Sequence, residues 1–208
     1  MALDYADIEG IIKTANFSKL KGELENAVFD VKAYPYPFND DENKRELCKD
    51  VAALANNKGG FLIIGVNEIV ELNSPHKKVD GVTGIDKSKV DKQKYSAFIN
   101  NYIYPKLDVE FEYATLDNKD IFYIKIPPNL KGKPYLVDRK DGYFAYYIRT
   151  DESGITINTK EIHERLVKGA QFEDHLIGIN DKLDFLVKKA ATSGQPPAQQ
   201  PQDYKKLL

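Results

Sequence analysis

The sequence predicts an α/β protein of the α+β kind, in which helices flank a mixed, largely antiparallel sheet and a further helix follows at the C-terminus. Apolar residues recur at helical spacing in three segments: about 7–15, 41–58 and 89–104. Four other runs are continuously apolar or alternate apolar with polar residues, as strands do: 27–34, 61–66, 109–116 and 121–126. Because only the short turn DNKD separates the last two runs, they predict an antiparallel hairpin.

The boundaries of the first elements follow from capping and turn residues. A helix over 7–15 places three isoleucines on one face, which is typical of an amphipathic helix. Asp40 or Asp41 is expected to cap the next helix, and the pair Gly59-Gly60 is expected to end it. The run FLIIGV that follows contains almost no polar residue, which indicates a buried strand.

The middle of the chain is expected to be less regular. Residues 67–87 are polar and rich in turn formers, so a loop is predicted there. Ser88 with Asp91 three positions later resembles a capping box, and the helix that it opens should stop at Pro105. Beyond the first hairpin, the runs YLVD and YFAYYIR flank Asp141-Gly142 and predict a second hairpin.

The C-terminal part predicts three regions: a domain over 1–169, an amphipathic helix over 170–191 and a disordered tail over 192–208. Asn158 and Glu161 indicate the start of the last helix of the domain. After it, apolar residues alternate three and four apart: Phe172, Leu176, Ile179, Leu183, Leu186 and Ala190. This seam covers under three heptads, so the helix either packs on the domain or pairs in a coiled coil. The tail is rich in Pro and Gln and has no apolar face to bury.

Composition limits the classes of protein to which this chain can belong. The 208 residues carry a formal net charge of −2, which argues against a strongly basic, non-specific nucleic-acid coat but leaves a local basic face possible. The sequence has one cysteine, no apolar run long enough to cross a bilayer, and no signal-peptide pattern. We therefore expect a cytoplasmic protein without a disulfide, a zinc site or a membrane span.

The strand near residue 30 carries the first candidate for chemistry. Side chains two positions apart in a strand share a face, so Asp30 and Lys32 should project together while Val31 enters the core. A carboxylate that binds Mg²⁺ or Mn²⁺ and a lysine beside it are what a metal-dependent phosphodiesterase needs. Glu25 can join them only if the chain turns between Asn26 and Val28. The alternative is an exposed acid–base pair without catalytic meaning.

The second candidate is NNKGGFLIIGVNE, residues 56–68. Its glycines let the backbone turn sharply, and Glu68 at the end of the buried strand could meet Asp30 around a metal ion. The alternative is a plain connection between a helix and a strand. No Gly-Lys-Ser or Gly-Lys-Thr occurs, which excludes a phosphate loop. Arg149, at the end of an aromatic strand, either binds a phosphate or forms a surface salt bridge.

Taken together, these motifs resemble the Schlafen AlbA-type domain family over roughly residues 20–168. The family has a Glu, an acid-Phe-Lys motif five residues on, a helix ending in Asn-x-x-Gly-Gly, and a strand ending in Gly-Val-x-acid. Here these are Glu25, Asp30-Val31-Lys32 and NNKGGFLIIGVNE, followed by KGKPYLV and YFAYYIRTDESGIT. The chain departs from the pattern in having Asp30 where Glu is usual, a valine in place of the phenylalanine, and Glu68 where Asp is common.

The resemblance implies a metal-dependent endoribonuclease that acts on structured RNA such as tRNA, with a role in phage defence or translational shut-off. Glu25, Asp30 and Glu68 would then bind Mg²⁺ or Mn²⁺, and Lys32 would stabilise the developing charge. Nucleic-acid contacts are expected from three basic residues: Lys58, Lys133 and Arg149. RNA is favoured over DNA as the partner.

Two other functions stay open. The domain could bind DNA or RNA without cutting it, as a transcriptional regulator does, or act as a scaffold whose C-terminal helix recruits a partner. A homodimer is expected, because the vertebrate relatives hold RNA between two fused copies and this chain has a single copy. Residues 170–191 supply the candidate interface.

Overall fold

The computed structural model describes residues 2–70, 77–130, 132–139, 143–149, 155–156, 182–184 and 186–188. The chain divides into two units, Met1–Leu166 and Val167–Leu208. The described residues of the second unit are helical, with exposed apolar side chains at Leu183, Leu186 and Val187. The rest of the helix predicted over 170–191, the helix predicted after Asn158 and the tail over 192–208 lie outside the described residues.

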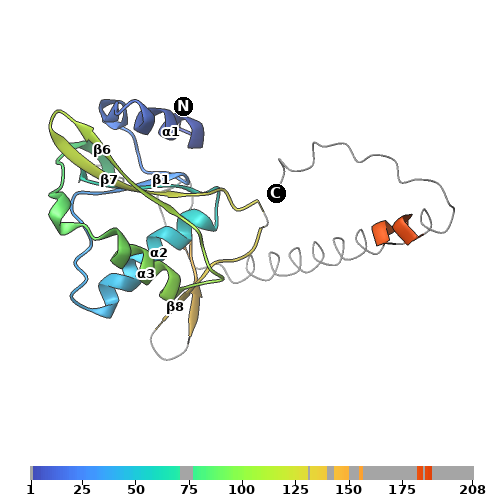
Figure 1. The fold of residues 1–208 in the computed structure, drawn as a ribbon. Helices are drawn as coiled ribbons and strands as arrows, with labels where there is room; N and C mark the ends of the chain where they lie inside the picture. Colours follow the sequence, from blue (N-terminus) through green and yellow to red (C-terminus); the bar gives the residue numbers. More distant parts are fainter. Residues whose placement is uncertain are drawn as a thin grey trace. The chain divides into compact units, whose positions relative to one another are not determined.

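A four-stranded sheet forms the centre of the first unit (Figure 1). Its strands, in spatial order, are β1 (Phe29–Lys32), β2 (Gly60–Ile64), β7 (Lys119–Ile126) and β6 (Glu110–Leu116). Strands β1 and β2 are parallel, whereas β2–β7 and β7–β6 are antiparallel. The mixed, largely antiparallel sheet predicted from the sequence is therefore confirmed.

Helices cover both faces of this sheet. Helix α1 (Tyr5–Lys13) lies on one face with the short 3₁₀ helix η1 (Phe17–Leu20), and α2 (Asp41–Ala55) and α3 (Lys92–Tyr102) lie on the other (Figure 1). Alternate residues of β2 enter the two cores, because successive side chains of a strand point to opposite faces. Phe61 and Ile63 pack toward α1, whereas Leu62 and Ile64 pack toward α2 and α3. This explains why the run is apolar at every position.

The predicted caps are correct for α2 and displaced for α3. The Asp40 side chain accepts the N–H of Asn43 at 2.8 Å and so caps α2. For α3 the capping residue is Asp91, whose Oδ1 accepts the N–H groups of Gln93 and Lys94. The capping box opened by Ser88 was wrong. Ser88 lies in the 3₁₀ helix η2 (Lys87–Lys89), where its hydroxyl donates to Asp86 instead.

The loop predicted over 67–87 was also wrong. That stretch contains a hairpin of β3 (Val66–Val70) and β4 (Lys77–Val82). Gly65 separates β2 from β3, and its φ of 105° lies in a region that favours glycine. Val66 and Val79 enter the core on the α1 side of the sheet, and polar residues separate the apolar positions of both strands. This mixture of residues has the composition of a loop.

The remaining strands follow the predicted hairpins. Asp117 and Asn118 both have positive φ in the turn between β6 and β7, as expected for a tight two-residue hairpin turn. The second predicted hairpin appears as β8 (Leu136–Asp138) and β9 (Phe144–Tyr146), with β5 (Ile103–Tyr104) as the third strand. A separate pair joins β10 (Ile148–Arg149) to β11 (Ile155–Thr156). Among the described residues, no helix has the length and apolar character needed to cross a membrane.

Candidate metal centre

Three carboxylates from separate segments meet in the first unit. Glu25, Asp30 and Glu68 each offer one oxygen, and the three oxygens lie within 4.8 Å of one another. Carboxylate oxygens in this number are the donors that Mg²⁺ and Mn²⁺ favour. The convergence expected from the sequence is confirmed, and the cluster could bind a metal ion.

Strand β1 places Asp30 and Lys32 on one face. Phe29 and Val31 enter the core beneath α1, so Asp30 and Lys32 point to the opposite side of the sheet. Lys32 Nζ lies 2.7 Å from Asp30 Oδ2. The shared face was predicted correctly, but the alternative of an exposed pair is wrong, because the Asp30 side chain is 1% exposed.

A turn brings Glu25 to the same place. The N–H of Asn26 donates to the carbonyl of Phe29 at 3.4 Å, and Asn26 Oδ1 accepts the N–H of Val28 at 2.8 Å. This local hydrogen-bonded turn reverses the chain between Glu25 and β1. Glu25 Oε1 then accepts the N–H of Val31 at 2.7 Å. The sequence required such a turn for Glu25 to reach Asp30, and the structure has it.

Glu68 reaches the cluster through an irregularity in β3. The pairing of β3 with β4 shifts register between Asn67 and Glu68, which re-aims the following side chain. Glu68 Oε2 lies 3.1 Å from Nζ of Lys77, whereas Glu68 Oε1 is buried and has no hydrogen-bond partner among the residues that the structure describes. Asp30 Oδ1 is also buried, and Nη1 of Arg149 lies 3.3 Å from it. A buried carboxylate oxygen without a partner is costly, and a cation at the cluster would satisfy Glu68 Oε1.

Arg149 lies inside the cluster, with its side chain 4% exposed. Its Nη2 donates to Glu25 Oε2 at 2.6 Å, its Nη1 lies 3.3 Å from Asp30 Oδ1, and its Nε donates to the Asn26 carbonyl. The interpretation of Arg149 as a surface salt bridge is therefore wrong. Asn57, at the end of α2, donates to the Arg149 carbonyl at 2.5 Å and holds this backbone in place.

Asp50 of α2 belongs to the same network, and the sequence analysis missed it. Asp50 Oδ2 lies 3.3 Å from Lys32 Nζ and accepts the hydroxyl of Tyr36 at 2.6 Å. Lys32 is thus held between Asp30 and Asp50. One signal was available: Asp50 lies three residues after Leu47 and four before Leu54, in the apolar stripe of its helix, where an acid is out of place.

Burial and mutual repulsion shift the ionisation of these acids. Burial, followed by the hydrogen bond and the charge of Asp30, raises the pKa of Glu25. Burial would also raise the pKa of Asp30, but its hydrogen bond with Glu25 and the cations Lys32 and Arg149 lower it. Burial and the Asp30 charge raise the pKa of Asp50. Burial opposes the charge of Lys32, yet the Asp30 and Asp50 carboxylates raise its pKa.

The formal charges leave the cluster negative. The four acids contribute −4 and the two inner cations, Lys32 and Arg149, contribute +2, which gives −2. Adding the outer Lys77, whose side chain is 61% exposed, brings the sum to −1. These sums count every group as ionised; in the metal-free protein the raised pKa of Glu25 keeps a proton there, and a divalent cation would take the place of that proton.

The Asn-x-x-Gly-Gly motif has a structural role. Asn56 is fully buried and donates to the carbonyls of Tyr135 and Tyr147, which anchors the β8–β9 region to the end of α2. A Cβ on Gly60 would lie 2.2 Å from the carbonyl oxygen of Val28, and one on Gly59 would lie 2.6 Å from backbone that follows β7. Gly60 therefore allows β2 to lie close to the backbone just before β1, and Gly59 allows the chain to pass close to the end of β7.

Two of the predicted nucleic-acid contacts lie elsewhere on the domain. Lys58 is exposed in the turn after α2. Lys133 is half-buried before β8, and its carbonyl accepts a hydrogen bond from Asn129. Their contact with nucleic acid remains a prediction.

The fold and the acidic cluster define an α+β domain with a candidate metal centre at the edge of its sheet. The family model described as Schlafen, AlbA_2 matches residues 25–158, which is more than half of the chain. The chain therefore belongs to the Schlafen AlbA_2 family, and this membership is consistent with a function connected with nucleic acid.

Two solved structures are similar to parts of this chain. The DIP2311 protein from Corynebacterium diphtheriae is 17% identical, with a TM-score of 0.45 over 74% of this chain and 26% of its own. This chain thus spans about a quarter of that protein. The N-terminal domain of an ATP-dependent DNA helicase RecG-related protein from Nitrosomonas europaea is 19% identical, with a TM-score of 0.44 over 67% of this chain and 86% of its own. No curated protein matches the sequence.

Proposed function

We propose that the domain is a metal-dependent endoribonuclease that cleaves structured RNA such as tRNA. Glu25, Asp30 and Glu68 would hold Mg²⁺ or Mn²⁺. The observation that carries the proposal is the convergence of three carboxylates, in which the buried Glu68 Oε1 has no hydrogen-bond partner among the described residues. Family membership supports nucleic acid as the substrate class.

The side chains around the metal site have separable tasks. When bound, the metal supplies Lewis-acid polarisation of a phosphodiester oxygen and lowers the pKa of a bound water. Lys32 keeps 34% of its side chain exposed while Asp30 and Asp50 hold its ammonium, so it can meet charge that develops on the phosphate. Arg149 is almost fully enclosed, and its contacts orient Glu25 and Asp30 rather than grip an incoming strand.

A second candidate function, binding without cleavage, also has an observation in its favour. Each of the three acids already has a cationic neighbour: Arg149 for Glu25, Lys32 for Asp30 and Lys77 for Glu68. Such pairing stabilises carboxylates in a domain that never takes up a metal. One feature favours cleavage over this alternative: the buried Glu68 Oε1 has no hydrogen-bond partner among the described residues.

Cleavage assays decide between the two functions. The protein is incubated with total tRNA and with duplex DNA, each with Mn²⁺, Mg²⁺ or EDTA. We expect metal-dependent cleavage of tRNA that Asp30→Asn and Glu68→Gln abolish, and that Asp108→Asn and Glu110→Gln leave intact. The control acids have side chains that are 89% and 70% exposed, outside the cluster. Binding of RNA with no cleavage in either metal would establish the second function.

We also propose that two copies pair through residues 170–191, with phage defence or translational shut-off as the biological setting. A single copy with net charge −2 offers little attraction to a long polyanion, so pairing would enlarge the binding surface. The exposed apolar side chains of Leu183, Leu186 and Val187 support an interface on this helix.

A further inference from the structure

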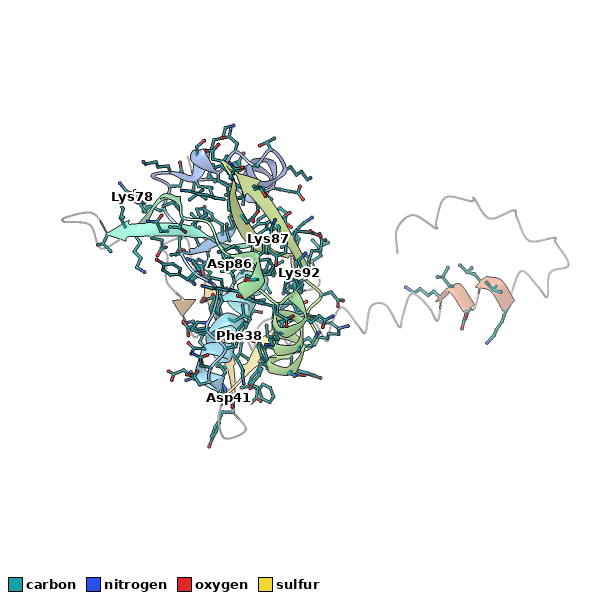
Figure 2. The ribbon with its side chains drawn as sticks, turned by 60° about the vertical axis from the view of Figure 1, so that its left-hand side comes forward. Phe38, Asp41, Lys78, Asp86, Lys87 and Lys92 are labelled. Carbon is teal, nitrogen blue, oxygen red and sulfur yellow. The ribbon has the colours of Figure 1, made fainter. Side chains whose placement is uncertain are left out.

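The loop after β1 borders two neighbouring hollows, which together are called the groove. One hollow of about 600 Å³ lies along residues 34–39, and another of about 390 Å³ lies between this loop and the turn of the β6–β7 hairpin. Both are lined by Tyr34, Pro35 and Lys89, so they lie next to each other. Figure 2 shows this side of the domain, with Phe38 at one end of the groove and Asp86 toward the other.

The groove combines an aromatic surface with available positive charge. Tyr34 is 75% exposed. Lys89 and Lys94 line the groove, and neither makes a hydrogen bond or ion pair through its side chain to the residues that the structure describes. The neighbouring Lys87 and Lys92 are engaged with Asp120 and Glu112. Two ammonium groups on one rim are therefore free to meet an anion.

The carboxylates around the groove already have hydrogen-bond or ion-pair partners within the domain. Asp86 accepts the N–H and the hydroxyl of Ser88, Asp91 caps α3, and Asp120 pairs with Lys87. The segments 86–94 and 118–120 hold five lysines and three aspartates, so the local charge is +2. This differs in sign from the chain as a whole and complements a polyanion.

A hydrogen-bonded path joins the groove to the acidic cluster. Tyr36 lines the larger hollow, and its hydroxyl donates to Asp50, which in turn contacts Lys32. Tyr34 follows Lys32 by two residues. Tyr36 and Asp50 therefore link the groove to Lys32, the lysine that contacts Asp30.

We infer that this groove binds a single-stranded segment of nucleic acid, with a base stacked on Tyr34 and backbone phosphates at Lys89 and Lys94. Stacking on an exposed aromatic ring with nearby cations is how proteins hold unpaired nucleotides. The inference rests on the proposed function in one respect: the strand held here is the one whose phosphodiester reaches the metal centre.

Binding is tested without metal, so that cleavage plays no part. Fluorescence anisotropy in EDTA measures the affinity of the full chain for labelled single-stranded RNA and DNA of about 12 nucleotides. We expect Tyr34→Ala to weaken binding roughly 5- to 100-fold through lost stacking, and Tyr34→Phe to bind as the wild type does. Tyr104→Ala, at a tyrosine that is 67% exposed on β5, is the matched control and should bind normally.

Salt dependence tests the two lysines. Replacing both Lys89 and Lys94 by alanine should lower the slope of log affinity against log salt concentration by about 1.4, because two phosphate contacts are lost. Lys106→Ala, at a side chain that is 72% exposed, should leave the slope unchanged. Melting temperatures equal to that of the wild type establish that the variants fold.

Three results would overturn the inference: no binding of single strands by the wild type at low salt, unchanged binding by Tyr34→Ala and the double lysine variant, or a preference for duplex that does not depend on Tyr34. Cleavage in Mn²⁺ is measured separately. Tyr34-dependent binding without cleavage would refute only the nuclease function, whereas cleavage with Tyr34-independent binding would refute only the groove.

Discussion

Manganese should stabilise the folded domain in proportion to its occupancy of the acidic cluster. The three carboxylates lie within 4.8 Å of one another only in the native chain, so the ion binds the folded state and not the unfolded one. At a concentration 100 times its Kd, such a ligand adds about 2.7 kcal/mol to the free energy of unfolding. For a domain of this size, each kcal/mol shifts Tm by about 2–4 °C, which predicts an increase of roughly 5–11 °C.

Thermal melting over a manganese series measures this shift, and Glu68→Gln is the informative variant. It removes one charged donor at nearly constant size and leaves the partly exposed Lys77 in place. The variant should lose most of the shift, whereas Glu110→Gln, at an exposed acid of β6, should keep it. The metal assignment fails if manganese leaves the melting temperature of the wild type unchanged, or if Glu68→Gln responds equally.

The same binding should release a proton. In the metal-free protein the pKa of Glu25 is raised from its ordinary 4.5, so the folded state holds a proton that the unfolded state gives up. This group's contribution to stability therefore falls as pH rises above 4.5. A metal ion must displace that proton, so its apparent affinity should rise about tenfold per pH unit until Glu25 is ionised. Calorimetry in buffers of different ionisation enthalpy measures how many protons are released per metal ion bound. A value of zero would contradict the raised pKa of Glu25.

Three further predictions concern the scaffold, the network and the assembly. Gly60→Ala should destabilise the domain by roughly 2 kcal/mol or more, because its Cβ would collide with a backbone carbonyl, while Gly81→Ala meets open space and should melt like the wild type. Asp50→Asn should slow cleavage roughly 10- to 100-fold with RNA affinity retained, since it loosens the hold on Lys32; an unchanged rate would remove Asp50 from the mechanism. If two copies pair, light scattering should give twice the 23.6 kDa chain mass, and Leu183→Glu should halve it; a wild type that is monomeric at all concentrations would refute pairing.

Local sequence patterns were sufficient for the elements that depend on neighbours in the chain. The apolar periodicity of α1 and α2, the cap at Asp40 and the turn at Asp117-Asn118 all act within a few residues, and each was predicted. The β3–β4 hairpin was missed because polar residues separate its apolar positions, so the buried Val66 and Val79 do not form a continuous or alternating apolar run. The α3 cap was misplaced because Ser88 and Asp91 are both acceptable capping residues, and only their surroundings choose between them.

The candidate site was found by motif rather than by periodicity. The sequence motifs identified Glu25, Asp30 and Glu68 as candidate metal ligands. Their spacing also required a turn before β1 if Glu25 was to reach Asp30. Neither that turn, built on the Asn26 side chain, nor the register shift before Glu68 leaves a regular pattern in the residue types. The motif match therefore gave the identities of the acids and the expectation that they meet, while the turn and the register shift that bring them together were visible only in the structure.

The sequence by itself determined which groups can ionise, the cap of α2 at Asp40 and the tight hairpin of β6 and β7. Tertiary structure alone decided which charges are buried together. Arg149 pairs with Glu25 across 124 positions of the chain, and Asp50 meets Lys32 only because α2 packs on the face of the sheet where β1 presents it. Propensities and turns are local properties of the backbone, whereas burial and ion pairing depend on contacts between distant segments, which residue spacing does not encode.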